Sequence, residues 1–239
     1  TNLDDQGWTG PATIQETDNG TGKNVLVTTP TATIGASDTN NGVWGTDYLT
    51  NVLNLTTAGA ATASLTVAGD LNIGNDGSGN AVQTNPAGSS AAAAAISAGS
   101  IKLSIASTAG AIYYNWIGTY GDNDTLTATN LQVGYAGDQG GAENYGGTWT
   151  VTNTLIGDQA TASSNYVLVA DGGTTTNNGQ MVVGVGGSFN TLYVGYLGSA
   201  GTLDMSVFEH RVFPLSDVNG AVAALKAGNG GFTNFVVRP

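Results

Sequence analysis

The sequence predicts an all-β protein: a right-handed parallel β-helix, or β-solenoid, in which successive coils of the chain stack on one another. Three observations predict it, namely a glycine-rich composition, short alternating strands and a recurring corner motif. The 239 residues include 37 glycines, and only 9% are charged. Helix-forming Glu, Lys and Arg are therefore scarce, which favours strands and turns. With 40% hydrophobic residues the chain can bury a core, unlike a disordered segment.

The recurring motif joins a short strand, a tight corner, a second short strand and a glycine. Full copies occur at Ser64–Gly74, Thr125–Gly134 and Thr148–Gly157, and half copies at Gln180–Gly184 and Thr191–Gly195. Apolar and polar residues alternate over four or five positions of each copy, so one face points inward. Such short strands cannot bury that face alone. Stacked about 4.8 Å apart, however, coils pair each strand with its neighbours and close a continuous core.

The domain boundaries follow from where the motif starts and stops. We expect a polar N-terminal arm over residues 1–22 and the solenoid over 23–207. Residues 208–239 are expected to form a C-terminal cap, with a helix over about 216–227 and a final strand over about 232–237. A β-sandwich is the alternative fold, because it also uses short strands and glycine-rich turns. The repeated corner favours the solenoid.

One of these copies carries a family resemblance. Leu192–Leu203 resembles the autotransporter-associated β-strand repeat of bacterial surface and secreted proteins, and Leu71–Gly74 and Leu131–Gly137 match that repeat more loosely. The resemblance implies a right-handed parallel β-helix displayed outside the cell. Pro214–Ala221 also resembles the C-terminal region of medium-chain alcohol dehydrogenases. We interpret this second likeness as convergence, because the chain has no cysteine with which to bind zinc.

The charge balance excludes several classes of partner. A net charge of −12 repels phosphate, so we expect no nucleic-acid partner. No run approaches the roughly 20 apolar residues that a membrane-spanning helix requires, so we expect no membrane span. Richness in Asn, Thr and Gly with few basic residues is typical of exported bacterial proteins. The expected location is therefore extracellular, at the cell surface.

The residues do not form a catalytic constellation, and we predict that the protein is not an enzyme. His210 is the only histidine. A metal site with several histidines is therefore not possible, and a Ser-His-Asp triad would have only this one residue to use. Most carboxylates lie in glycine- and asparagine-rich turns, where Asp is common for turn chemistry alone. The five basic residues are dispersed rather than gathered along a groove. A polysaccharide-degrading enzyme remains a less favoured alternative.

Four aromatic residues form the candidate binding site: Tyr113, Tyr114, Trp116 and Tyr120. Such rings stack on sugars, and they also occur at subunit interfaces. An insertion loop that packs on the solenoid would explain the same cluster. The sequence leaves these three readings open.

Calcium is the metal that the turns favour, and no other cofactor is expected. Asp122 and Asp124 lie in one turn and Asp76 in another, and both turns place oxygen ligands where a hard cation could bind. Neither turn matches the EF-hand loop, and solvated turns are the simpler reading.

Two sets of outward threonines could stack as ladders on a flat face. A flat threonine face could order water, so ice binding is a further alternative, although Thr is also a common strand residue because of its β-propensity. The two sets are Thr125, Thr127 and Thr129, and Thr148, Thr150 and Thr152.

The favoured function is that of an extracellular structural protein, a surface or matrix subunit that associates with itself into filaments. Open coil ends and a polar arm motivate this hypothesis. Trp8, Phe232 and Phe235 are the candidate assembly residues, because they lie near the two ends of the chain. The alternative is an adhesin or carbohydrate-binding module with glycan partners.

Overall fold

The computed structural model of the chain falls into two units, Thr1–Asp204 and Met205–Pro239. We describe each unit by itself. The residues that the structure describes are 3–4, 12–15, 25–29, 31–34, 51–56, 62–74, 79–85, 93–105, 115–196, 199–204, 210–214, 216, 219 and 234–238. Among them, no helix is long and apolar enough to cross a membrane.

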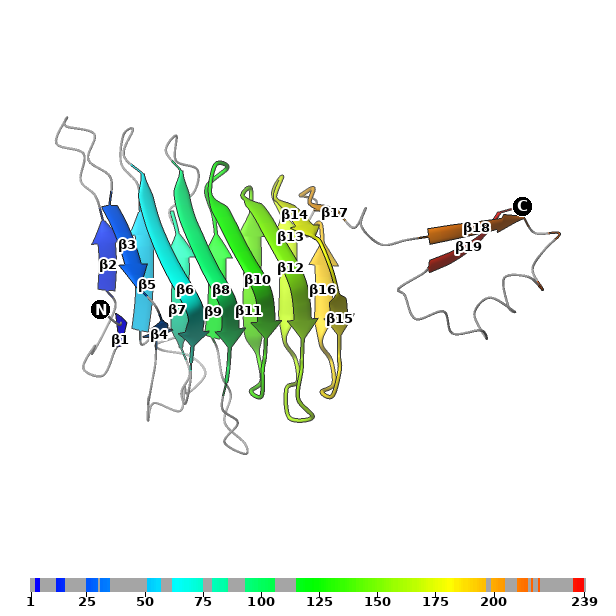
Figure 1. Cartoon of the computed structure of the whole chain (residues 1–239), viewed down its shortest axis with the longest axis horizontal. Helices are drawn as coiled ribbons and strands as arrows, with labels where there is room; N and C mark the ends of the chain where they lie inside the picture. Colours follow the sequence, from blue (N-terminus) through cyan, green and yellow to red (C-terminus); the bar gives the residue numbers. More distant parts are fainter. Residues whose placement is uncertain are drawn as a thin grey trace. The chain divides into compact units, whose positions relative to one another are not determined.

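The first unit is a right-handed parallel β-helix built from two sheets (Figure 1). Sheet A contains, in spatial order, β1 (Leu3–Asp4), β4 (Ala32–Ile34), β6 (Ala63–Ile73), β8 (Ala94–Leu103), β10 (Thr125–Val133), β12 (Thr148–Ile156), β14 (Thr174–Asn177) and β17 (Thr202–Asp204). Two more strands pair within it: β3 (Val25–Thr29) with β6, and β15 (Met181–Val183) with β12. Sheet B contains β2 (Ala12–Gln15), β5 (Asn51–Thr56), β7 (Asn80–Thr84), β9 (Asn115–Thr119), β11 (Gly140–Tyr145), β13 (Tyr166–Ala170) and β16 (Thr191–Val194).

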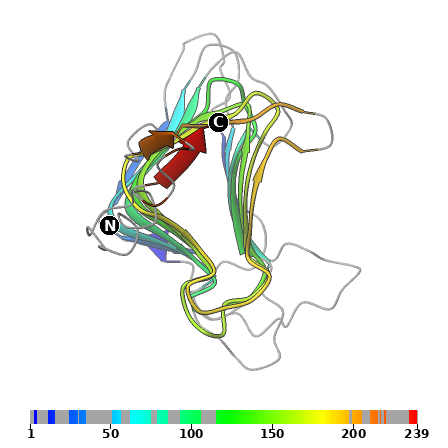
Figure 2. The same cartoon turned by 90° about the vertical axis from the view of Figure 1, so that its right-hand side faces the viewer.

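From β4 to β14 successive strands alternate between the sheets, so each of these coils gives one strand to sheet A and the next to sheet B. β3 with β4, and β14 with β15, are consecutive strands of sheet A that pair with the two halves of one long strand, β6 and β12 respectively. A view along the stack shows the coils superposed, with the two sheets on opposite sides (Figure 2). All the strand pairs of this unit are parallel, for example β10 with both β8 and β12. The β-sandwich alternative is excluded, because it needs antiparallel sheets.

The long strands of sheet A turn a corner halfway along. In β10 the inward–outward alternation breaks at Thr129 and Asn130, where two consecutive residues face outward, and β12 repeats the break at Thr152 and Asn153. Pairing with the neighbouring strand continues on both sides of the corner. The predicted order of strand, corner and strand is therefore confirmed, within one continuous β-strand.

Glycines with positive φ end the repeats, as predicted. The φ values are 71° at Gly74, 69° at Gly134, 71° at Gly157, 74° at Gly184 and 77° at Gly195. L-residues with a side chain rarely adopt this conformation, and glycine adopts it without a steric penalty. The first four follow strands of sheet A and let the chain cross to sheet B, whereas Gly195 follows β16 of sheet B.

The core fills the space between the sheets. Leu71 and Leu131 are fully buried, and Leu192 is partly buried and packs against the same cluster. Trp149 is also fully buried, and its Nε1 donates a hydrogen bond to the Thr119 Oγ1 at 2.8 Å. The stack therefore hides the apolar face of each short strand.

The N-terminal boundary differs from the expected one. Residues 1–22 were expected as a polar arm, yet β1 pairs with β4 and β2 pairs with β5 in parallel register. The reason lies in the sequence around Ala12 and Ile14. These two residues alternate with polar ones over only four positions, and the polar composition of the flanking segment obscures so short a strand pattern. The first coil therefore begins inside that region.

The described residues of the second unit form a two-stranded parallel sheet, built from β18 (His210–Pro214) and β19 (Asn234–Arg238). β19 confirms the expected final strand, displaced from about 232–237. The helix expected over about 216–227 lies almost entirely outside the described residues.

Candidate binding surface and assembly end

The outer face of sheet B carries a band of tyrosines. Side chains alternate across a strand, and the inward positions of sheet B fill the core, so the intervening positions face outward. We call the following residues the tyrosine band: Tyr120, Tyr145, Tyr166, Tyr193 and Tyr196, with Glu143 among them. They come from four consecutive coils, because β9, β11, β13 and β16 are neighbours in the sheet.

Glu143 joins two parts of this band. The Tyr120 hydroxyl donates to Glu143 Oε2 at 2.8 Å, and the Tyr166 hydroxyl donates to Glu143 Oε1 at 2.5 Å. The Tyr120 and Tyr145 rings are stacked, with centroids 5.5 Å apart. Tyr193 packs edge to face on Tyr166 at 6.4 Å and on Tyr196 at 6.0 Å. One connected set of side chains therefore crosses four coils.

Two of the rings lie against glycine backbone. A Cβ added at Gly118 would come within 2.6 Å of the Tyr120 ring, and one added at Gly141 within 2.7 Å of the Tyr166 ring. Both glycines face outward, on the same side of sheet B as the rings. Each ring therefore covers the strand where a side chain would otherwise stand.

Burial and the glutamate keep these phenols protonated. Desolvation raises the pKa of Tyr120 and of Tyr166 well above the ordinary value, and the negative charge and hydrogen bond of Glu143 raise it further. Both hydroxyls therefore remain donors to the Glu143 carboxylate over the neutral range. Hydrogen bonds to a charged acceptor are among the stronger ones in proteins.

Sequence reasoning found only part of this band. Of the candidate binding residues, Trp116 and Tyr120 lie on the outer face of sheet B, whereas Tyr113 and Tyr114 lie outside the described residues. The missed residues are Glu143, Tyr145, Tyr166, Tyr193 and Tyr196. A signal was present in the sequence, since Asn-Tyr at 144–145 and Thr-Tyr at 119–120 place a tyrosine after each member of the Asn144–Thr119 pair.

Trp116 stands at the margin of the band. In the sheet register it lies directly across Gly141 from Tyr166. Its side chain is half-buried, and its Nε1 is buried with no acceptor among the described residues. A buried donor without an acceptor is uncommon, so it marks a place where a further polar group would be stabilising.

The calcium candidates do not share one environment. Asp124 is fully buried, and its carboxylate accepts hydrogen bonds from Thr84 Oγ1 (2.6 Å), Asn85 Nδ2 (2.7 Å), Ala94 N (2.9 Å) and Gly121 N (2.9 Å). Asp122 in the same turn is exposed. Asp76 lies outside the described residues. In the described part of the chain no group of three or more His, Asp or Glu gathers as a metal site would, and calcium binding stays a prediction.

The threonine ladders exist on the outer face of sheet A. Thr125 pairs with Thr148 and Thr148 with Thr174, while Thr127 pairs with Thr150 and Thr150 with Thr176. The members in β10 and β12 are exposed. Ice binding by this face stays a prediction, because β-propensity explains the same residues.

The last coil of the first unit exposes an apolar surface. Among the described residues, the large hydrophobic side chains that are exposed all lie between residues 183 and 196: Val183, Val185, Phe189, Tyr193, Val194 and Tyr196. Phe189 is 87% exposed. We call these residues, with the free edges of β16 and β17, the end coil.

The remaining candidates lie elsewhere. Of the three candidate assembly residues, Phe235 lies in β19 and pairs with Arg211 in β18, and Trp8 and Phe232 lie outside the described residues. His210 begins β18 opposite Asn234. The second unit therefore gives no further geometry for a site.

Comparison with known proteins adds no relative. No protein-family model, no curated protein and no solved structure matches this chain.

Proposed function

We propose that this protein is an extracellular structural protein whose solenoid stacks end to end on further copies of itself. The observation that carries the proposal is the end coil, which gathers the exposed large hydrophobic side chains of the described residues. Exposed apolar groups concentrated at one place are characteristic of an interaction surface.

Both ends of the stack leave strand edges to be paired. Among the described residues, β16 and β17 pair on one side only, and so do β2 and β1 at the opposite end. An edge strand presents a row of unpaired N–H and C=O groups, which is a template for another chain. Because all the ladders of the solenoid are parallel, the last coil of one copy and the first coil of the next could continue both sheets.

The end coil has few of the features that normally prevent such pairing. Soluble proteins place charges, prolines or bulges on exposed edges to block association. Residues 172–203 contain no Asp, Glu, Lys, Arg or Pro, although the chain as a whole carries a net charge of −12, and Asp204 at the end of β17 is the charged residue that follows them. The sequence therefore leaves this end open to a partner.

A second copy of the chain fits the end coil. A second copy offers edges for both sheets, β1 in sheet A and β2 in sheet B. Such head-to-tail contacts do not close on themselves, so they generate filaments.

Sedimentation velocity and electron microscopy of the full chain test the proposal. The wild type should form concentration-dependent, end-to-end assemblies. Val194→Lys should remain monomeric, because an interface that buries an unpaired ammonium group is strongly disfavoured. Thr150→Lys is the matched control: it adds the same charge on the exposed face of sheet A and should assemble as the wild type does.

Two results would contradict the proposal. One is a wild type that stays monomeric at every concentration, and the other is a Val194→Lys variant that assembles as well as the wild type.

A further inference from the structure

We propose that the tyrosine band binds a neutral polysaccharide that runs along the stacking direction of the coils. Tyr193 and Tyr196 belong to both the tyrosine band and the end coil, whereas Tyr120, Glu143, Tyr145 and Tyr166 belong to the band alone. The inference rests on these four residues, on the outer face of sheet B. The band is built from side chains of four consecutive coils, and Glu143 connects its two parts.

The rings of the band lie close against the sheet. Those of Tyr120 and Tyr166 pack on the backbone of Gly118 and Gly141, and the Tyr145 ring stacks on that of Tyr120. Amphipathic rings of this kind provide a flat apolar surface beside a polar hydroxyl group. The C–H face of a pyranose sugar is complementary to such a surface, whereas its hydroxyls require polar partners at the margin.

The side chains of the tyrosine band are held in fixed positions. The hydrogen bonds to Glu143 fix Tyr120 and Tyr166, and Tyr145 is held by stacking on Tyr120 at 5.5 Å. A surface whose side chains are already ordered loses less conformational entropy when a ligand binds. Each Glu143 oxygen accepts one tyrosine hydroxyl and retains a lone pair with which to accept a sugar hydroxyl.

The spacing of the coils suits a polysaccharide that runs along the stack. Neighbouring coils are about 4.8 Å apart, which is close to the length of one sugar unit in an extended polysaccharide. Tyr193 follows Glu143 by two strands in the same row of the sheet, across Leu168. A polymer laid along the stack would therefore meet a side chain of the band at regular intervals rather than at a single pocket.

The charge of the surface decides which class of polysaccharide fits. In the described part of the first unit Lys102 is the sole basic side chain, and it forms an ion pair with Asp70 at 2.7 Å on sheet A. An acidic glycan would meet Glu143 and a chain of net charge −12 with no cation to offset them. Neutral glycans avoid this repulsion.

Affinity electrophoresis of the full chain tests the inference, in gels that contain soluble β-glucan, xylan, galactomannan or, as the acidic comparison, alginate. We expect retardation in at least one neutral gel and none in alginate. Tyr145→Ala should abolish the retardation. Tyr166→Phe keeps the ring but removes its bond to Glu143, and should weaken it.

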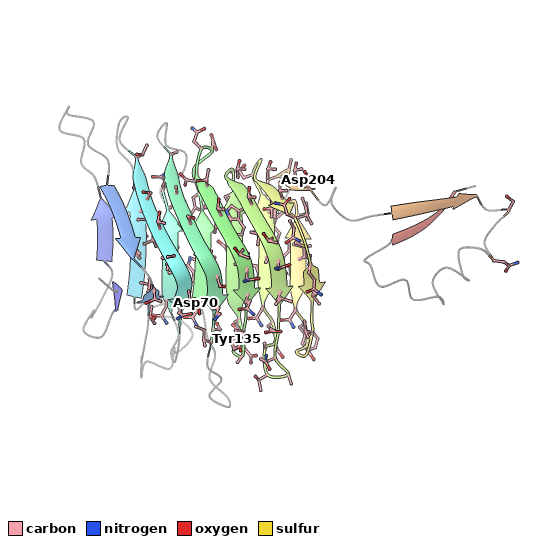
Figure 3. All side chains as sticks on the ribbon, in the orientation of Figure 1. Asp70, Tyr135 and Asp204 are labelled. Atoms are coloured by element: carbon pink, nitrogen blue, oxygen red, sulfur yellow. The ribbon has the colours of Figure 1, made fainter. Side chains whose placement is uncertain are left out.

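Two controls separate this site from folding and from assembly. Tyr135→Ala removes a half-buried tyrosine beyond the end of β10, at the rim of the stack (Figure 3), and should bind as the wild type does. Val194→Lys should also keep its binding, while Tyr145→Ala should still assemble. Absence of retardation in every neutral gel overturns the inference, as does retardation of Tyr145→Ala equal to the wild type, or retardation by alginate alone.

Discussion

Inside the solenoid a column of asparagines runs along the start of the sheet B strands. It lies directly over the glycines that end the repeats, which we call the corner glycines. A Cβ added at Gly134 would lie 2.1 Å from the Asn165 carboxamide, and one added at Gly172 would meet nothing within 4 Å. Both glycines have positive φ, 69° and 82°. Gly134→Ala and Gly172→Ala therefore form a matched pair that differs in packing alone.

The structure gives the size of the expected difference. Both substitutions place an L-residue in the left-handed region, at a cost of about 1–2 kcal/mol. Gly134→Ala must also displace Asn165, whose Oδ1 accepts a hydrogen bond from the Gly140 backbone N–H at 2.6 Å. Leaving a buried donor unsatisfied costs about 1–3 kcal/mol. We therefore expect Gly134→Ala to be the more destabilising by about 1–3 kcal/mol.

Urea unfolding followed by tryptophan fluorescence measures both variants. Equal losses of unfolding free energy for the two variants would refute the reasoning, because the asparagine column would then contribute nothing at this corner. The chain already contains the reciprocal case. Ser104 replaces the corner glycine with a φ of 54°, and the next coil has Gly140 where an asparagine would stand. We therefore expect the loss of unfolding free energy in the double variant Gly134→Ser, Asn165→Gly to be smaller than the sum of the losses in the two single variants.

Two further predictions concern buried polar groups. Asp124→Asn replaces one acceptor oxygen with an amide that faces the Ala94 or Gly121 N–H, so it should lower the unfolding free energy by about 1–3 kcal/mol in the same urea assay. An unchanged free energy would show that the turn adapts. The raised pKa values of Tyr120 and Tyr166 mean that the unfolded chain ionises first, so stability should be complete below about pH 10 and fall above it. Thermal unfolding temperatures measured between neutral and alkaline pH check this prediction. In Tyr120→Phe the unfolding temperature should decrease less steeply with rising pH than in the wild type.

The fold could be predicted from the sequence because its signals are local. The corner glycines at 74, 134 and 157 follow alternating strands, and a positive φ is a property of one residue. The alternation in the repeat copies predicts one inward face, and Leu71 and Leu131 in two of these copies are buried. The N-terminal coil was missed because Leu3–Asp4 and Ala12–Gln15 are too short to show a period.

The candidate site was harder to predict, because it depends on register between coils of unequal length. Tyr120 and Tyr166 meet at Glu143 only when β9, β11 and β13 are in their observed alignment. The loops between the strands vary in length, which hides this alignment in the printed sequence. The asparagine column was missed for the same reason, although Asn80, Asn115 and Asn165 are all fully buried.

The glycines beneath the tyrosine rings argue that this face is more than a by-product of stacking. Glycine inside a strand weakens the strand, because it provides no side chain to pack and loses more entropy on folding. Gly118 and Gly141 accept that cost at outward positions, where no core packing requires a small residue. The threonines of sheet A need no such explanation, because they are favourable strand residues. Sheet A also has outward glycines, Gly69 and Gly99, but they lie where β6 and β8 turn the corner. On sheet B, Gly118 and Gly141 lie instead where the rings of Tyr120 and Tyr166 pack against the strand.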